Sequence, residues 1–178
     1  MKYFFLIIFT FFLNADICEI FKMEEILKYS DRDSILIFDI DNTLITTKQL
    51  YGSDQWFSYE FKKNIKNYSY DLAFEKTLDE WFKIQALTEV KPIEENIPDL
   101  IKNLQSKNFK ILALTTGDIF FALPTIKQLN SVGIDLSRNS FSDKDIFFEN
   151  GTLYKNGIIF CSGLNKGEIL NQFFKKIH

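Results

Sequence analysis

Histidine is almost absent from this chain of 178 residues, because the single copy, His178, is the last residue. A reaction that needs histidine as a general base or as a zinc ligand therefore has no residue to carry it within the chain. This argues against Ser-His-Asp hydrolysis and against histidine-rich metallohydrolases as function classes.

Cysteine is also scarce, since only Cys18 and Cys161 occur and they lie far apart in the sequence. Two such residues do not make a zinc knuckle or a thioredoxin-like pair. A disulfide between them is one interpretation for an oxidising compartment. The other, which we expect, is a buried free thiol at Cys161, because three apolar residues precede it.

The chain also lacks an excess of positive charge, because it has 21 Lys and Arg against 24 Asp and Glu and a net charge of −3. Binding to the phosphate backbone usually leaves a basic footprint, so no nucleic acid partner is expected. The hydrophobic fraction of 46% and the charged fraction of 25% are typical of a globular protein. The length suits one domain that carries a modest insertion.

No apolar run is long enough to span a bilayer, which needs about 20 residues in a helix. The longest, Tyr3 to Leu13, follows Lys2 and ends close to Ala15. This pattern is typical of a secretory signal peptide over residues 1–15, with a mature chain of 16–178. It predicts a periplasmic or secreted protein without a stable membrane span after cleavage. The alternative is an apolar first helix or strand of a cytosolic protein.

The most informative stretch is 35–44, in which four apolar residues run directly into Asp39 and Asp41, with Thr43 two residues further on. The apolar run predicts a buried parallel strand, and Asp39 then lies at its carboxyl end. Open α/β folds bind ligands at that edge of the sheet. The alternative is a strand end closed by an Asx turn, in which both carboxylates bond nearby backbone amides.

A second apolar run, 111–114, is followed by Thr115, Thr116 and Gly117, and an amphipathic helix over 97–104 precedes it. A helix followed by a strand predicts a right-handed crossover in a parallel sheet. A threonine hydroxyl at the end of such a strand can donate a hydrogen bond to a phosphoryl oxygen. Thr115 is the first candidate, and Thr116 is the alternative if the strand boundary differs by one residue.

A third pattern lies near the end of the chain, where Asn165 predicts the N-cap of a helix that begins with Lys166. The helix dipole disfavours a cation in the first turn. A phosphate held by both the ammonium group and the helix N-terminus would remove this conflict. The alternative is an exposed lysine without a ligand.

Between these patterns the periodicity predicts further elements. Two helices are expected within a segment of about 46–92, where aromatic residues recur at helical spacing. Aromatic residues at this spacing more often pack between helices than form a lid over a substrate, so we expect packing. A short helix is expected over 20–29, another from Pro124 to Gly133, and a β-ribbon around Asn150-Gly151 and Asn156-Gly157.

Asp39-x-Asp41-x-Thr43, Thr115 and Lys166, in this order, resemble three motifs of the haloacid dehalogenase (HAD) superfamily. The resemblance implies an α/β, HAD-type Rossmann-like three-layer fold with a parallel sheet and a small helical cap inserted after the first catalytic strand. It implies a phosphatase or phosphotransferase that acts on a small phosphorylated compound. Asp39 would form an aspartyl-phosphate and Asp41 would act as acid and base.

The same resemblance implies that Thr115, Thr116 and Lys166 bind the phosphoryl oxygens, and that Asp39 and Asp41 hold Mg²⁺. The chain departs from the family at the fourth motif, an acidic strand end after the lysine helix, because only twelve residues follow Lys166. We therefore expect a truncated chain whose sheet exposes apolar surface. A non-catalytic or degenerate protein, serving as a phosphate-binding or interaction module, is the alternative function.

Overall fold

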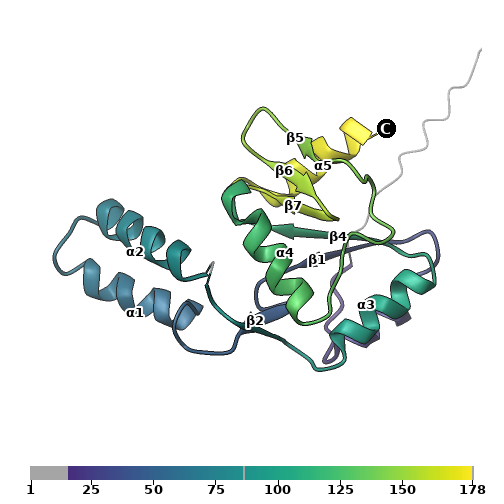
Figure 1. Cartoon of the computed structure of the whole chain (residues 1–178), viewed down its shortest axis with the longest axis horizontal. Coiled ribbons are helices and arrows are strands. Elements are labelled where there is room, and N and C mark those ends of the chain that lie inside the picture. Colours follow the sequence, from purple (N-terminus) through teal and green to yellow (C-terminus); the bar gives the residue numbers. More distant parts are fainter. Residues whose placement is uncertain (1–15, 86, 178) are drawn as a thin grey trace, which may run out of the picture.

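The computed structural model describes residues 16–85 and 87–177 and has a mixed α/β architecture (Figure 1). The predicted signal peptide, residues 1–15, lies outside the described residues. In chain order the elements are η1 (Met23–Lys28), β1 (Ile35–Asp39), β2 (Ile45–Thr47), α1 (Asp54–Asn64), α2 (Tyr70–Gln85), β3 (Val90–Pro92), α3 (Ile97–Ser106), β4 (Lys110–Thr115), η2 (Ile119–Phe121), α4 (Ala122–Ser131), β5 (Ile146–Phe147), β6 (Leu153–Lys155), β7 (Ile158–Phe160) and α5 (Lys166–Ile177).

The central sheet has five strands in the order β1-β4-β7-β6-β5. Strand β4 pairs in parallel with β1 and with β7, whereas β6 pairs antiparallel with β7 and with β5. Asp39 lies opposite Leu114, and Thr115 lies opposite Phe160. The carboxyl ends of the three parallel strands therefore meet at one edge of the sheet, as expected for an α/β domain.

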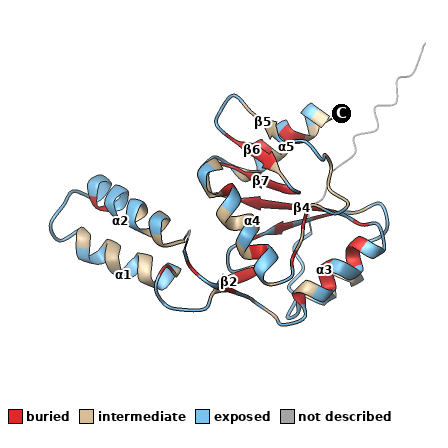
Figure 2. Cartoon of the chain, in the orientation of Figure 1, coloured by how far each residue is buried: buried red, intermediate tan, exposed pale blue. Residues whose placement is uncertain are grey.

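Apolar side chains bury both faces of this sheet. Alternate residues of β4 point to opposite faces, so Ile111 and Ala113 join one core cluster and Leu112 and Leu114 join the other. Helices α3 and α4 cover the first face, and α5 covers the second through Ile169 and Phe173. Figure 2 shows the buried residues concentrated in the sheet and on α3.

Strand β1 lies at the edge of the sheet, which corrects the expectation of an interior strand. Its burial alternates, and Ile35 and Ile37 are 42% and 41% exposed. Ile37 lies opposite Leu112, which is fully buried. The apolar surface that we expected the sheet to expose is present at these two isoleucines.

The predicted β-ribbon forms, and Asn156 and Gly157 make its turn with φ angles of 49° and 78°. These positive angles are those of a type I′ hairpin turn, which favours Asn-Gly. The ribbon is part of the central sheet, because β7 also pairs with β4. The helix expected over 20–29 is only the short η1, which contains no buried residue.

The two helices expected within 46–92 are α1 and α2, which form a hairpin inserted between β2 and β3. The β2–β3 pair closes its base, with Ile45 opposite Pro92 and Thr47 opposite Val90. Aromatic rings join the two helices, because Phe57 makes edge contacts with Phe74 and Trp81. Within the described residues, no helix combines the length and the apolar character that a membrane crossing requires.

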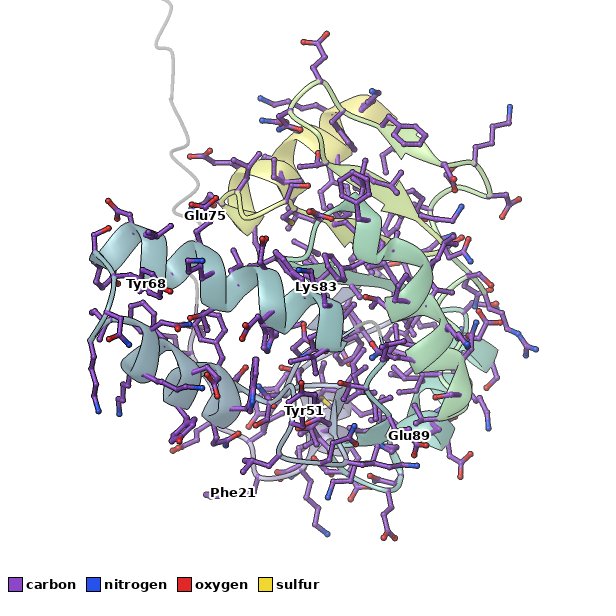
Figure 3. The ribbon with its side chains drawn as sticks, turned by 60° about the vertical axis from the view of Figure 1, so that its left-hand side comes forward. Phe21, Tyr51, Tyr68, Glu75, Lys83 and Glu89 are labelled. Carbon is purple, nitrogen blue, oxygen red and sulfur yellow. The ribbon has the colours of Figure 1, made fainter. Side chains whose placement is uncertain are left out.

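Figure 3 shows how this insertion meets the core. Lys83, near the end of α2, lies over the core, whereas Tyr68, in the connection between α1 and α2, lies far from it. Gln128 of α4 fixes the junction by donating to the carbonyl oxygens of Gln85 and Thr88 at 2.8 and 2.9 Å. The last turns of α2 are therefore held beside the edge of the sheet where the parallel strands end.

Candidate functional site

Asp39 and Lys166 meet at this edge, although 127 positions separate them in the sequence. Lys166 Nζ donates to Asp39 Oδ1 at 2.5 Å, and both side chains are partly exposed. Lys166 is the first residue of α5, and Asn165 Oδ1 caps the helix by accepting from the amides of Gly167 and Glu168. The anion expected beside Lys166 is therefore the carboxylate of Asp39 in this structure.

Asp41 follows Asp39 by two residues and lines a cavity next to the ion pair. Surrounding protein partly removes the carboxylate of Asp41 from water and raises its pKa to about 6, and the negative charges of Asp39 and Asp54 act in the same direction. The charge of Lys166 and the nearby Thr115 hydroxyl oppose this increase. The side chain still has accessible surface, so Asp41 can exchange protons with a ligand or with water near neutral pH.

The raised pKa makes ionised Asp41 a cost to the folded state. An unfolded aspartate titrates near 3.8, so stability falls as the pH rises from 3.8 to about 6 and does not recover above that. We expect Asp41→Asn to raise the free energy of unfolding at pH 7.5 by about 1 kcal/mol, allowing for solvent screening.

Urea denaturation at two pH values measures this effect. The gain should disappear at about pH 3.5, where the carboxyl group is largely protonated in both states. Asp143→Asn, at an exposed position, is the control and should be neutral at both pH values. An Asp41→Asn variant that is equally stable or less stable than the wild type at pH 7.5 would contradict the raised pKa.

Thr115 is the last residue of β4, as the first of the two alternatives predicted, and Thr116 follows it; both residues line the cavity. Thr115 is buried, and its Oγ1 accepts from the amide of Gly117 at 3.1 Å. The carbonyl oxygen of Thr116 accepts from the amide of Gly163 at 2.8 Å. This last bond ties the loop that follows β4 to the loop that follows β7.

The cavity has a volume of about 610 Å³ and lies between α2 and the core. Its lining comprises Asp41, Phe74, Leu78, Trp81, Phe82, Gln85, Thr115, Thr116, Gly117, Asp118, Phe121, Pro124, Thr125, Gln128, Ser162 and Gly163. Asp39 and Lys166 are not part of this lining, but their charges act on Asp41. The predicted residues therefore form two adjoining groups, an ion pair and a polar end of the cavity.

Several residues of this region escaped the sequence analysis. Asp54, the first residue of α1, accepts from Asn42 Nδ2 at 2.6 Å and raises the pKa of Asp41. Trp81 and Phe82 of α2 both pack against other rings and line the cavity, although packing alone was favoured for such residues. The helical spacing of these two residues can be read from the sequence. Whether their side chains lie at the cavity depends on how the inserted helices pack against the core.

The expected Mg²⁺ site rests on Asp39 and Asp41. Throughout residues 16–85 and 87–177, no group of three or more His, Cys, Asp or Glu is placed to hold a metal ion. Asp118, the acidic residue nearest to Thr115 in the sequence, accepts from the amide of Phe120 at 2.7 Å and caps η2. Mg²⁺ at Asp39 and Asp41, which would need further oxygen ligands besides these two side chains, stays a prediction.

Both cysteines are free, which confirms the second of the two interpretations. Cys161 is buried directly after β7, and burial raises the pKa of its thiol above the ordinary value. Cys18 is exposed. A protonated, buried thiol packs as a small apolar group and is a poor nucleophile.

Comparisons with known proteins find a family model described as "Protein of unknown function (DUF2608)" over residues 17–178. A "Putative outer membrane protein" of Chlamydia pneumoniae is 23% identical over 166 residues, which are 88% of this chain and 60% of the relative. One of Chlamydia trachomatis serovar D, with the same description, is 25% identical over 146 residues, which are 82% and 55%. The chain thus spans little more than half the length of these relatives, and no solved structure matches it significantly.

These matches correct the HAD assignment. The matching family is DUF2608, and neither the family model nor these relatives carry a haloacid dehalogenase description. The names of the family and of these relatives likewise give no support to a classification as a magnesium-dependent hydrolase or phosphatase, which had followed from that assignment. Short motifs of one to five residues describe local chemistry, and such chemistry recurs in unrelated families.

Proposed function

We propose that the site of this chain, which belongs to the DUF2608 family, transfers the phosphoryl group of a small phosphorylated compound through Asp39. The proposal depends on the geometry of the site and not on a family likeness. The observation that carries it is the ion pair of Asp39 and Lys166 beside Asp41, whose pKa is about 6. This arrangement supports roles as nucleophile for Asp39, as cation for Lys166 and as proton donor for Asp41.

Each side chain has a role that its position supports. Lys166 bonds Oδ1 of Asp39, and this contact leaves Oδ2 to approach phosphorus. Lys166 can also contact the phosphoryl oxygens as negative charge develops on them. Thr115 and Thr116 supply hydroxyl groups from the end of β4. Asp41, which holds a proton over part of the neutral range, protonates the leaving oxygen.

The proposed reaction has two steps. An oxygen of Asp39 forms a bond to phosphorus, the bond from phosphorus to the ester oxygen breaks, and the proton of Asp41 passes to that oxygen. Water then attacks the aspartyl-phosphate, its proton returns to Asp41, and inorganic phosphate leaves with Asp39 regenerated. Both steps use only side chains of this chain and water. Dependence on Mg²⁺ stays a prediction, and assays with added Mg²⁺ and with EDTA test it.

A second candidate is a phosphate-binding module without catalysis. The observation that favours it is the same ion pair, because the charge of Lys166 is already balanced by Asp39 at 2.5 Å. A ligand would then have to share Lys166 with Asp39. This candidate predicts saturable binding of phosphate without a covalent product.

The location that we propose is the cell envelope. The relatives from Chlamydia are named as outer membrane proteins, and the first fifteen residues have the pattern of an export signal. A substrate of the proposed reaction would then be a phosphorylated compound outside the cytoplasm.

The test of this function is to trap the covalent intermediate. Wild-type protein incubated with acetyl phosphate or 4-nitrophenyl phosphate and quenched in acid should carry one phosphoryl group on Asp39, located by mass spectrometry of peptides. Hydroxylamine should remove the group, because acyl phosphates react with it. Phosphate release without any adduct on Asp39 would refute the nucleophile, and saturable phosphate binding with neither adduct nor turnover would favour the second candidate.

A further inference from the structure

The cavity beside Asp41 has one apolar side and one polar end. Phe74, Leu78, Trp81 and Phe82 reach it from α2, and Phe121 and Pro124 reach it from the segment that follows β4. The polar end holds Asp41, Thr115 and Thr116, which belong to the proposed phosphoryl site. A ligand in contact with this end therefore extends along a wall made largely of carbon.

Aromatic rings from two parts of the chain meet in this wall. The rings of Phe82 and Phe121 are stacked, with centroids 4.5 Å apart and an interplanar angle of 26°. Trp81 contacts Phe82 with centroids 5.6 Å apart. The indole Nε1 of Trp81 is buried and finds no acceptor among the described residues. Flat rings and their edges favour a flat apolar partner, because offset and edge-on contacts add to the gain from burial.

The charges around the cavity restrict the ligand further. Among the described residues that line it, the ionisable side chains are Asp41 and Asp118, and none is Lys, Arg or His. A second phosphate or a carboxylate on the ligand would face these acids without a cation to balance it. Lys166 is not part of the lining and pairs with Asp39.

We propose that the cavity binds the aromatic remainder of a phosphate monoester, so that the substrate class is aryl or arylalkyl monophosphates. The word substrate in this inference rests on the proposed function, because it assumes phosphoryl transfer. Binding of the aromatic group in the cavity does not require that transfer. The volume of about 610 Å³ lies in the range of cavities that enclose small organic ligands. Nucleoside diphosphates and sugar bisphosphates do not fit the charge of the lining.

Steady-state kinetics test the substrate class. We expect kcat/KM for 1-naphthyl phosphate to exceed that for glycerol 1-phosphate and hexyl phosphate by about tenfold or more, the scale of a well-matched apolar pocket. Phe82→Leu keeps much of the apolar volume but removes the ring. It should abolish most of the preference by raising KM for 1-naphthyl phosphate. Phe120→Ala, at a position 81% exposed on the same short helix as Phe121, is the matched control and should leave the preference unchanged.

Binding without reaction separates this inference from the proposed function. Phenylphosphonate and methylphosphonate carry a carbon–phosphorus bond that the proposed reaction does not cleave, and binding near Trp81 is measured by tryptophan fluorescence. If no ester is turned over but phenylphosphonate binds more tightly than methylphosphonate and Phe82→Leu removes the difference, the inference stands and the reaction fails. Turnover of all esters with equal kcat/KM, or equal binding of both phosphonates, would overturn the inference.

Discussion

Replacing Asp39 with asparagine is expected to lower kcat for phosphoryl transfer by about 10³-fold or more, the scale seen when a covalent nucleophile is removed. The amide has nearly the same shape as the carboxylate, but its oxygen is a far weaker nucleophile. The variant also loses the negative charge that Lys166 neutralises in the ion pair. Lys166 is then free for phosphate, so KM should not increase.

The control for Asp39→Asn is Asp145→Asn. Asp145 forms a comparable ion pair with Lys155 at 2.6 Å, and its side chain is 37% exposed against 47% for Asp39. Both substitutions remove one partly exposed ion pair, which contributes at most about 1 kcal/mol to stability. Only Asp39→Asn should affect the reaction. Equal rates for the wild type and Asp39→Asn would exclude Asp39 as the nucleophile.

Replacing Gly157 with alanine is expected to lower the free energy of unfolding by about 2 to 5 kcal/mol. Gly157 has a φ of +78°, in which an L side chain is strained. A Cβ at this position would lie 2.1 Å from the carbonyl oxygen of Leu136, so backbone must move. The turn joins β6 to β7, and β7 pairs with β4, so the strain reaches the centre of the sheet.

Gly151→Ala is the matched control for this prediction. Its φ of +79° is nearly the same, but a Cβ there would have nothing within 4 Å. Its cost should be limited to the backbone term of about 1 kcal/mol. Chemical denaturation of the three proteins separates the steric contact with Leu136 from the φ preference. If both variants lose the same stability, the close approach of Leu136 is not present in solution.

The ion pair also bears on how the site would work. Once Asp39 carries a phosphoryl group, Lys166 can contact the new oxygens without leaving its place at the start of α5, because the two side chains are already in contact. The same contact balances the charge of Asp39 before the reaction. The phosphoryl group of an aspartyl-phosphate would bring its own negative charge, so the negative charge that raises the pKa of Asp41 would not be lost in that state.

Much of the local structure could be predicted from the order of residues. The run before Asp39, the run before Thr115 and the helix that follows Asn165 all form as their patterns indicate. These features depend on neighbours within a few positions, such as alternating apolar residues and a side chain that caps the next amides. The Asn-Gly turn at 156–157 is local in the same sense.

The placement of strands could not be predicted in the same way. An apolar run such as 35–38 fits an interior strand and an edge strand equally well, because the other strands decide which edges are covered. The parallel pairing of β7 with β4 likewise joins residues that are distant in the sequence. The short motifs suggested a superfamily that the comparisons do not support, since spacing within a motif carries little information about ancestry.

The order of residues alone thus determined that Asp39 ends one strand, that Thr115 ends another and that Lys166 begins a helix. These outcomes follow from short-range propensity and capping. Only the folded chain determined that Lys166 contacts Asp39, that burial and nearby charges raise the pKa of Asp41 to about 6, and that Trp81 and Phe82 line the cavity. Packing and charge act through space, and the distances that govern them exist only after distant segments have come together.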